Sequence, residues 1–479
     1  MYMEETMSFS GKKVLVMGLG LHGGGAGAVE FLARRRAKIT VTDLRTARQL
    51  APTIRALQHL KGIRYVLGKH HTQDFLAADV IIKNPGVRLD SPYLKAADAK
   101  GIPITSDMGI FFAMCPAQII GVTGTRGKST TTYLIWKLLK TKFGNRVHYG
   151  GNIRKSVLAI LPRIKKGDLV VLELSSFQLQ DLAAEKISPH IAVITNLLRD
   201  HLNWHRDMHE YAQAKAAIFR FQQPGNHLFI NSEDAGLRRL VRRAPAHMHT
   251  VAAATPLGSR QYSPILENAG MSGIVDRNLG AHYRPSVALA IAVARHFGVP
   301  DAAIAKTVRI HKGLPARQEL IATVRGVRFI NDTTATIPDA AIAAIRRFRA
   351  LAGSSHRLIL IAGGQDKKLD FRTMAREMEK NVDAAVFLPG TATDILIRES
   401  RVKNQESRRL KSKSKVQSSK KYFLARSMEE AVATAWKEAG KSGYIVLSPG
   451  AASFGLFLNE FDRGDQFVQA VKKVTRKKK

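Results

Sequence analysis

The stretch AQIIGVTGTRGKSTTTYLIWKLL, residues 117–139, decides how the centre of the chain folds. Its first residues are apolar, as in a buried strand, and a Gly-rich turn then leads into a helix that opens with Ser and Thr. Similar alternations begin at KKVLVMG near the start and return after Gly313 with VRFINDTTAT, RLILIAGG, AAVFLPG and YIVLSPG. Strands that alternate with helices predict an α/β protein with mostly parallel sheets.

The length predicts more than one domain. A chain of 479 residues is too long for a single core, and at roughly 100–200 residues per domain it predicts three. We place them at 1–113, 114–312 and 313–479, with a Rossmann-like first and third domain and a nucleotide-binding centre. No internal sequence repeat accompanies the shared alternation of strand and helix.

Composition limits the classes of protein that need consideration. The single cysteine, Cys115, excludes an internal disulfide and a multi-thiolate metal site. The apolar run VLVMGLG is too short for a signal peptide or a membrane span, so we expect a cytoplasmic protein. The formal charge of +37 favours polyanions. However, the basic residues lack interleaved aromatic side chains, so no specific nucleic-acid binding is expected. The basic stretch 398–421 is expected to form a flexible surface loop.

The Gly-rich turn of the central stretch predicts a phosphate loop. Its backbone N–H groups can converge on phosphate oxygens, and the helix N-terminus adds partial positive charge. The strict spacing would place a glycine at Val122, whereas glycines stand at Gly121 and Gly124, so the loop is a variant. We expect Lys128 to reach the β- and γ-phosphates and the hydroxyl that follows it to bind Mg²⁺.

A second Gly-rich turn, GLGLHG at 18–23, follows the first strand, and Asp43 stands about twenty residues further on. Alone, this pattern suggests a dinucleotide-dependent oxidoreductase. The same turn can bind any pyrophosphate, so the motifs that accompany it must decide. An oxidoreductase would leave the GKST of the phosphate loop unexplained.

Three further residues suit a metal centre beside the phosphate loop. Glu173 ends the apolar strand of LELSSFQLQ, His201 follows the strand IAVIT, and Lys215 lies on the next helix. A carboxylate and a histidine near a phosphate loop are typical of Mg²⁺ at a phosphoryl-transfer centre. Each residue alone could equally be a solvated surface group.

The ordered series GVTGTRGKST, ELSSFQL, TNLLRDHLNWH, AKAAIF, GLPAR, NDTTAT, GGQDK and SPGAASF covers nearly the whole chain. In this order it resembles the Mur ligases, and most of all those that add D-glutamate to UDP-N-acetylmuramoyl-L-alanine. The resemblance implies an N-terminal domain for the uridine diphosphate, a central ATPase domain and a C-terminal domain for the amino acid. GLGLHG would then bind UDP rather than a dinucleotide.

The resemblance also implies the reaction and its cofactors. The alanyl carboxylate would attack the γ-phosphate of ATP, and the amine of the amino acid would displace phosphate from the acyl phosphate. Two Mg²⁺ ions would assist. The catalytic residues would be Lys128, Glu173, His201 and Lys215, with Lys215 carbamylated.

The same resemblance assigns binding residues. ATP would contact Gly121, Thr123, Gly124, Thr125, Arg126, Gly127, Lys128, Ser129, Thr130, Arg317 and Asp332. The metals would bind Ser129, Thr130, Glu173, His201 and Lys215. The UDP-sugar would contact Leu21, His22, Asp43, Arg45, Gly86, Asn152, Ser175 and Gln178. The amino acid would contact Thr336, Lys367 and Ser453.

Several positions depart from the family pattern. Arg126 stands where the phosphate loop usually has Asn, Ala316 replaces a His, and Thr334 replaces a Lys. Near the adenine, Tyr283 and Ser286 stand in place of asparagines. All of these departures concern residues expected to lie near ATP.

Alternatives remain within the family, because the same scaffold adds other amino acids in diaminopimelate or lysine ligases and in folylpolyglutamate synthase. Lys367 favours an acidic amino acid, since a cation would face its side-chain carboxylate. We further expect a monomer, with a possible weak association of 398–421 with an anionic membrane surface.

Overall fold

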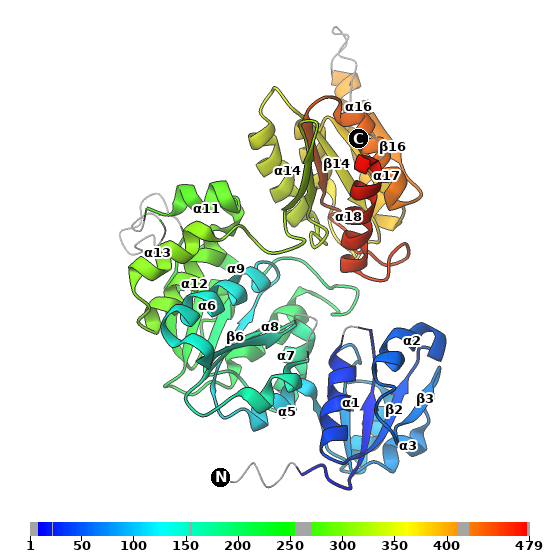
Figure 1. The fold of residues 1–479 in the computed structure, drawn as a ribbon, viewed down its shortest axis with the longest axis vertical. Coiled ribbons are helices and arrows are strands. Elements are labelled where there is room, and N and C mark those ends of the chain that lie inside the picture. The colour runs from blue at the N-terminus through cyan, green and yellow to red at the C-terminus, as the bar shows by residue number, and fades with distance from the viewer. Residues whose placement is uncertain are drawn as a thin grey trace. The chain divides into compact units, whose positions relative to one another are not determined.

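The computed structural model describes residues 8–21, 23–152, 156–253, 266, 270–410 and 421–476, without the side chains of 401–410. These residues form three sheets (Figure 1). The chain divides into two compact units. The first unit comprises residues 1–197, 209–271 and 284–309, and the second comprises 198–208, 272–283 and 310–479.

The first sheet of the first unit has the order β3-β2-β1-β4-β5, and every pair in it is parallel. Its strands are β1 (Lys13–Met17), β2 (Lys38–Asp43), β3 (Arg64–Leu67), β4 (Val80–Lys83) and β5 (Ile104–Ser106). The connecting helices are α1 (Gly24–Arg34), α2 (Ala47–Ala56), α3 (Thr72–Leu76), α4 (Pro92–Ala99) and α5 (Asp107–Met114). A reciprocal capping box between Thr46 and Gln49 starts α2.

The second sheet of the first unit is also wholly parallel, in the order β11-β10-β9-β6-β8-β7. Its strands are β6 (Gln118–Thr123), β7 (Val147–Gly151), β8 (Leu169–Glu173), β9 (Ile191–Ile194), β10 (His227–Asn231) and β11 (His247–Val251). Its helices are α6 (Lys128–Phe143), α7 (Ser176–Ala184), α8 (Met208–Arg220), α9 (Ala235–Leu240), α12 (Arg284–His296) and α13 (Asp301–Ile310), with short 3-10 turns η1 (Gly144–Arg146), η2 (Val157–Ala159) and η3 (Leu161–Arg163). Every residue of β8 and β9 is buried, as expected for central parallel strands.

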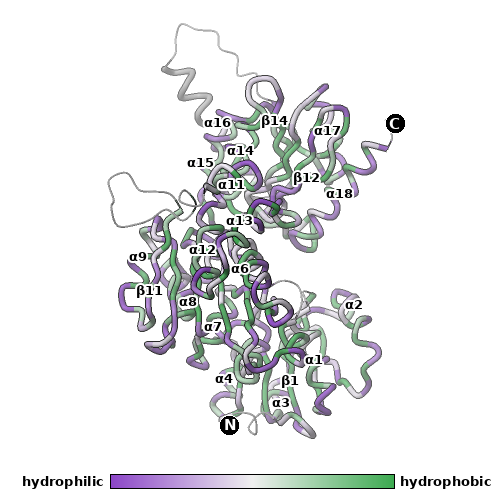
Figure 2. The backbone as a smooth tube through the Cα atoms, turned by 60° about the vertical axis from the view of Figure 1, so that its left-hand side comes forward, coloured by the Kyte–Doolittle hydropathy of each residue, from purple (hydrophilic) through white to green (hydrophobic). Residues whose placement is uncertain are grey.

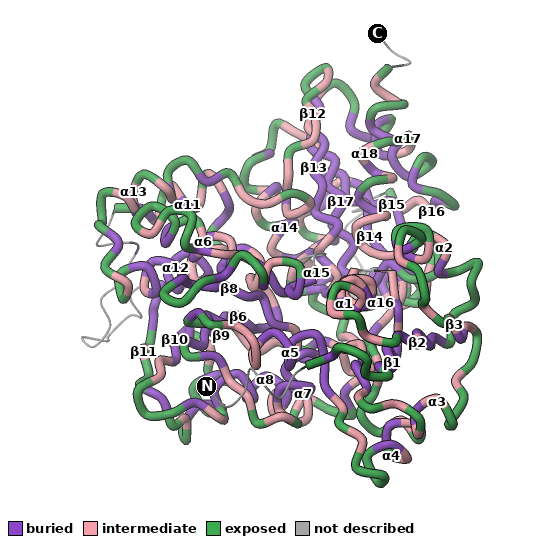
Figure 3. The backbone as a smooth tube through the Cα atoms, turned by 60° about the horizontal axis from the view of Figure 1, so that its bottom comes forward, coloured by how far each residue is buried: buried purple, intermediate pink, exposed green. Residues whose placement is uncertain are grey.

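The second unit has one six-stranded sheet in the order β12-β13-β17-β14-β15-β16. Its strands are β12 (Glu319–Val324), β13 (Val327–Asn331), β14 (Arg357–Gly363), β15 (Ala384–Leu388), β16 (Lys421–Leu424) and β17 (Gly443–Leu447). Its helices are α11 (Ser272–Asn278), α14 (Pro338–Ala352), α15 (Arg372–Asn381), α16 (Thr391–Leu410), α17 (Met428–Ala439) and α18 (Glu460–Arg476), with the 3-10 turn η4 (Ala281–Tyr283). Figure 3 shows the central strands β17, β14 and β15 as almost wholly buried.

The parallel α/β architecture confirms the expected fold class, and the strands expected from KKVLVMG, KITVTD, IAVIT and RLILIAGG are all present. Some strands at the edges of the sheets were not predicted from the sequence. The clearest is β12, which pairs with β13 in an antiparallel hairpin. Arg325 and Gly326 form its turn with positive φ, as a two-residue hairpin requires.

The loop expected at 398–421 is wrong for residues 398–410, which lie in α16. The Arg, Glu, Gln and Lys residues that gave the segment its polar character are also good helix formers. Residues 411–420 lie outside the described part of the chain. None of the helices among the described residues combines the length and the apolar character needed to cross a membrane.

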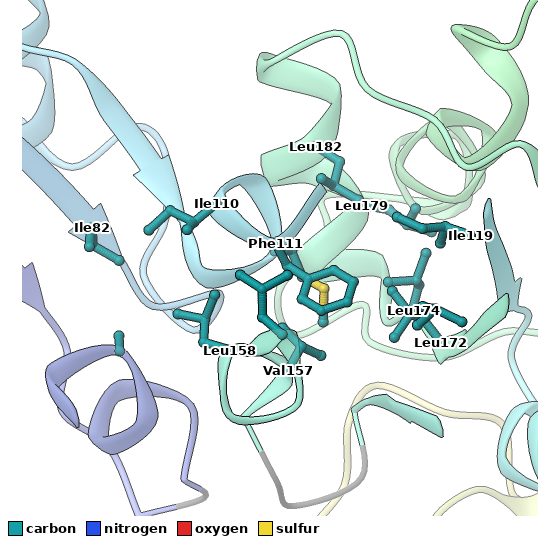
Figure 4. Close-up of a cluster of buried hydrophobic side chains, with 14 of the residues drawn as sticks. Ile82, Ile110, Phe111, Ile119, Val157, Leu158, Leu172, Leu174, Leu179 and Leu182 are labelled. Atoms are coloured by element: carbon teal, nitrogen blue, oxygen red, sulfur yellow. The ribbon is translucent and has the colours of Figure 1, made fainter. Parts of the chain in front are cut away.

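One continuous apolar core joins the two sheets of the first unit. Helix α5 and the turn η2 contribute Phe111, Val157 and Leu158, and α7 contributes Leu179 and Leu182 (Figure 4). Figure 2 shows hydrophobic residues along β1 and hydrophilic residues in the outer turns. The first sheet is therefore fixed to the second by packing, and its carboxyl-end loops keep a defined place within this unit.

A group of buried ionisable residues lies in the same unit. Lys83, at the end of β4, forms an ion pair with Asp181 of α7, and both side chains are buried. Thr105 donates a hydrogen bond to Glu185 at 3.1 Å. Burial raises the pKa of Asp107, raises that of Asp181 to about 6 and raises that of Glu185 to about 7, because one lysine does not compensate two buried carboxyls and a half-buried one.

We expect the Glu185→Gln variant to be more thermostable than the parent at pH 8, with a gain of roughly 2 °C or more. A carboxyl whose pKa is raised in the folded state binds protons more strongly when folded. Its contribution to stability is therefore complete below its ordinary pKa of 4.5 and is lost as the pH rises to about 7. Thermal unfolding measured from pH 4.5 to pH 8 should show the gain shrinking as the pH falls.

The matched control is Asp98→Asn, because Asp98 is an exposed carboxylate on α4. Asp98→Asn should not show the gain in unfolding temperature at pH 8. An equal loss of stability in Glu185→Gln at every pH would show that the carboxylate is needed as a hydrogen-bond acceptor and would contradict the prediction.

Candidate active site

The phosphate loop lies between β6 and α6 in the middle of the second sheet. Its glycines adopt positive φ, 140° at Gly124 and 82° at Gly127. A Cβ atom on Gly124 would lie 1.9 Å from the hydroxyl oxygen of Thr195, and one on Gly127 would lie 2.4 Å from the hydroxyl oxygen of Ser286. Both positions therefore require glycine for space as well as for conformation. The contact also places Ser286, one of the departures from the family pattern, directly against the loop.

The residues that follow β9 hold this loop in place. The backbone N–H of Arg126 donates to Asn196 Oδ1 at 2.8 Å, and Asn196 Nδ2 donates back to the carbonyl of Arg126 at 3.0 Å. Thr195 also donates to that carbonyl. The Thr125 hydroxyl lies 3.2 Å from the hydroxyl of Tyr211. Sequence reasoning missed Thr195 and Asn196, although the TN that follows IAVI is a polar turn at the expected ligand-binding edge.

Two lysines converge on the same loop. Lys128 Nζ donates to the carbonyls of Gly124 and Thr125 at 3.0 and 3.1 Å. Lys215, on α8, is 1% exposed and donates to the Gly124 carbonyl at 2.9 Å. Its ammonium also lies 4.6 Å from the centre of the Tyr211 ring. The structure thus brings both predicted catalytic lysines together within the first unit.

Glu173 lies on the neighbouring strand with a carboxylate oxygen available for a cation. It ends β8, opposite Val122 of β6, and is 3% exposed. Asn152 donates to Oε1 at 3.4 Å, whereas Oε2 is buried and has no hydrogen-bond partner among the described residues. A buried carboxylate oxygen without a hydrogen-bond partner destabilises the folded state unless a cation or a water molecule binds it. The residues present therefore fit a Mg²⁺ ion beside the phosphate loop.

Ser175 and Gln178 have a clear local role. They form a reciprocal capping box at the start of α7, in which the Gln178 N–H donates to Ser175 Oγ and the Ser175 N–H donates to Gln178 Oε1. The sequence pattern S-x-x-Q could have revealed this cap. The cap orients the loop after Glu173, and it uses polar atoms that the sequence analysis assigned to the sugar-peptide substrate.

The loops at the carboxyl edge of the first sheet also meet. Asp43 Oδ2 accepts hydrogen bonds from the N–H groups of Leu19 and Gly20 at 2.9 and 3.1 Å, and Oδ1 accepts from Arg45 N–H at 2.9 Å. Asp43 therefore shapes the Gly-rich turn. Asn84 packs against the same turn and accepts from the N–H of Gly86.

The structure thus gathers four of the expected UDP contacts, at Leu21, Asp43, Arg45 and Gly86, around one turn of the first sheet. His22 lies outside the described residues. Asn84 was not expected from the sequence, because no motif marks it.

The predicted ligands of the second unit form a different cluster. Lys367 Nζ lies 2.6 Å from Asp200 Oδ1, and both side chains are buried. The other carboxylate oxygen of Asp200 lies 3.5 Å from His201 Nε2. His201 has a positive φ of 54°. Asp200 therefore connects the residue expected to bind metal with the residue expected to bind the amino acid, and His201 belongs to a different compact unit from Glu173 and Lys215.

Backbone strain marks the neighbourhood of the other predicted contacts in the second unit. Ala316 and Gln318, on either side of Arg317, have φ values of 61° and 51°, and Lys368 beside Lys367 has 61°. Non-glycine residues rarely adopt this region, and such residues concentrate at functional sites. Asp332 accepts from Gln318 N–H at 3.2 Å and from Ser448 Oγ at 2.8 Å, so it fixes the strained segment.

The two loops expected to hold the amino acid are physically joined. Gln365 and Ala452 exchange backbone hydrogen bonds of 3.0 Å, which places the segments of Lys367 and Ser453 side by side. Thr336 follows β13, whose neighbour β17 precedes Ser453. The arrangement brings the three predicted amino-acid contacts to one edge of the third sheet.

Arg463 of α18 is a residue that sequence reasoning missed. It is fully buried and donates to the hydroxyl and the carbonyl of Thr333 at 3.1 and 2.7 Å and to the carbonyl of Ala451 at 3.1 Å. Burial lowers the pKa of its guanidinium to about 10, which leaves it charged at neutral pH. Arg463 therefore ties NDTTAT to SPGAASF, and no motif around it signals this.

Models of known families match all three parts of the chain. Residues 12–106 match the Mur ligase MurD-like N-terminal domain, 122–263 match the Mur ligase middle domain, and 316–451 match the Mur ligase glutamate ligase domain. Among solved structures, the UDP-N-acetylmuramate-alanine ligase MurC of Thermotoga maritima covers 97% of this chain with a TM-score of 0.59 and 16% identity. The MurF ligase of the same organism, solved with ADP, covers 99% with a TM-score of 0.56 and 15% identity. These likenesses confirm the fold.

Curated relatives extend over almost the full length. A UDP-N-acetylmuramoylalanine--D-glutamate ligase of Roseiflexus sp. (strain RS-1) is 40% identical, over 98% of this chain and 100% of its own. Proteins of the same name from Acetivibrio thermocellus and Borreliella burgdorferi are 34% and 33% identical, over 97% and 95% of this chain. Because identity of this level accompanies all three domain matches in their expected order, the chain belongs to the Mur ligase family.

Proposed function

We propose that the protein uses ATP to join D-glutamate to UDP-N-acetylmuramoyl-L-alanine, a step in the synthesis of peptidoglycan precursors. The proposal rests on the curated relatives, which have this name and match nearly the whole chain. The geometry supports it independently, since a phosphate loop, a carboxylate with a free coordination position and a buried lysine are all present.

The reaction has two chemical steps. An oxygen of the alanyl carboxylate attacks the γ-phosphorus of ATP, and ADP leaves with the electron pair of the broken P–O bond. The amine of D-glutamate then attacks the acyl carbon, loses a proton and expels phosphate as the amide bond forms. Both steps depend on positioning and on neutralisation of phosphate charge more than on covalent participation of the protein.

The first unit supplies the groups for the first step. The start of α6 would face the phosphates, because the N–H groups of Thr125 and Arg126 are already bonded to Asn196. Lys128 would exchange its two carbonyl partners for phosphate oxygens. Glu173 Oε2, with Ser129 and Thr130, would hold one Mg²⁺ ion, which would screen the charge of the β- and γ-phosphates. Lys215, once carbamylated, and His201 would serve a second ion.

The second unit supplies the groups for the amino acid. Lys367 would face the side-chain carboxylate of D-glutamate, with Thr336 and Ser453 beside it. Asp200 orients Lys367 through a charge-assisted hydrogen bond before the amino acid binds. Arg317 and Asp332 would contact ATP. We retain the monomeric state, cytoplasmic location and weak association with anionic membranes as predictions.

The decisive assay measures phosphate release from ATP with UDP-N-acetylmuramoyl-L-alanine, Mg²⁺ and one amino acid at a time. D-Glutamate alone should support release, and mass spectrometry should find a product heavier by one glutamyl residue. Release with a different amino acid would overturn the choice of D-glutamate while leaving the family chemistry in place. Absence of release with every amino acid would contradict the proposal.

Replacement of Lys367 by Met should raise the KM for D-glutamate about ten- to a hundredfold, because a charge-assisted hydrogen bond contributes about 1.5–3 kcal/mol. The KM for ATP should change little. Steady-state kinetics of the variant check this, and Lys368→Met is the matched control, since Lys368 is the exposed neighbour. Equal effects of the two substitutions would show that Lys367 does not recognise the amino acid.

Carbamylation of Lys215 predicts a ¹³C NMR resonance in the carbamate region when the protein is equilibrated with ¹³C-bicarbonate. The neutral amine would add to CO₂ with release of one proton, giving an anionic ligand for the second metal. The resonance should be absent from Lys215→Arg and present in Lys128→Arg. Loss of ligase activity on removal of CO₂, restored by bicarbonate, should accompany it. A resonance unaffected by Lys215→Arg would assign the modification elsewhere.

A further inference from the structure

Three histidines far apart in sequence come together on one face of the second sheet. His227 opens β10, His249 lies on β11, and His296 ends α12, which packs on both strands (Figure 3). One ring nitrogen from each lies within 4.8 Å of those of the other two. His227 Nδ1 and His249 Nε2 are 3.0 Å apart, and the ring centres of His227 and His296 are 4.3 Å apart.

This spacing suits a shared cation. Imidazole nitrogens bind Zn²⁺ at about 2.0–2.1 Å, which puts two nitrogens of a tetrahedral site about 3.3 Å apart. Small rotations of the rings would therefore bring all three nitrogens to one ion. His227 and His249 are half-buried and His296 is exposed, so an ion can enter from solvent and keep one position for water.

Ring stacking and strand pairing position the side chains of the cluster. His249 stacks on Phe229 with ring centres 4.3 Å apart and an interplanar angle of 8°, which fixes its plane. The parallel register sets Phe229 opposite His249 and His227 opposite His247. Ligands that come from two paired strands and a helix end are held more precisely than ligands on loops.

The cluster is separate from the proposed catalytic chemistry. His227 pairs in register with Ile191 of β9, and Ile191 pairs with Ile120 of β6. The phosphate loop begins four residues beyond Ile120, about 13 Å further along the strand direction. The strand order places β11 three strands away from β6. The ligation reaction therefore does not account for three converging imidazoles.

We propose that His227, His249 and His296 form a binding site for a divalent transition-metal ion of the Zn²⁺ type. Three imidazoles favour Zn²⁺, Cu²⁺ or Ni²⁺ over Mg²⁺ or Ca²⁺, which prefer oxygen ligands. The bound ion cross-links the edge strand β11 to β10 and to the end of α12. It thereby stabilises the outer edge of the second sheet, where β11 is the last strand among the residues that the structure describes.

Zn²⁺ binding to the full-length protein, freed of any histidine tag and stripped of metal, tests the proposal. Titration against a chromophoric chelator should be done with millimolar Mg²⁺ present, so that oxygen-rich positions are filled. We expect one Zn²⁺ per chain, with affinity lowered at least about tenfold in His249→Asn and in His296→Asn. The exposed His296 provides a variant that should fold even if His249→Asn does not.

Two controls assign the ion to this cluster. His59→Asn replaces an exposed histidine of the first sheet's layer and should leave the affinity unchanged. His201→Asn should also leave it unchanged, because His201 belongs to the predicted Mg²⁺ centre. Zn²⁺ should raise the unfolding temperature of the parent more than that of His296→Asn. Binding that is absent, insensitive to His296→Asn or abolished by His201→Asn would overturn the proposal.

Discussion

The active-site part of the first unit depends on the hydrogen bonds that residues at the end of β9 make to the phosphate loop. Thr195 and Asn196 hold both the N–H and the carbonyl of Arg126, and the two flanking glycines leave no space for side chains. These hydrogen bonds are possible because the strand order places β6 between β8 and β9. The same order brings Glu173 to the edge of the loop. A loop fixed before any nucleotide arrives loses little conformational entropy on binding.

In the second unit a buried guanidinium performs the equivalent task. Arg463 satisfies backbone carbonyls of the two loops that follow the paired strands β13 and β17. Burying a charge is costly, and it is tolerated only where hydrogen bonds replace the water that was lost. The positive φ values at Ala316, Gln318 and Lys368 indicate that these loops are held away from their relaxed conformations. The placement of these loops therefore lowers the stability of the second unit.

The sequence predicts elements that depend on local residue patterns. It does not predict contacts between residues that lie far apart in the chain. The central strands and the phosphate loop follow from apolar runs and glycine spacing, and the structure contains them. Arg463 lies 130 residues from Thr333, so spacing could not connect them. The loop predicted at 398–410 is helical, because composition alone does not separate exposed helix from irregular chain. The roles of the gathered binding residues stay predictions, since geometry places side chains without identifying their ligands.

The net charge of +37 has little to do with how the chain folds. Four basic side chains are buried among the described residues: Lys83, Lys215, Lys367 and Arg463. Each of them contacts a carboxylate or a carbonyl oxygen, so each has a structural or chemical reason to be charged. The other lysines and arginines that the structure describes are half-buried or exposed, and their charge affects solubility and association with polyanions more than the choice of fold. A chain with the same interior and a neutral surface would place its loops in the same way.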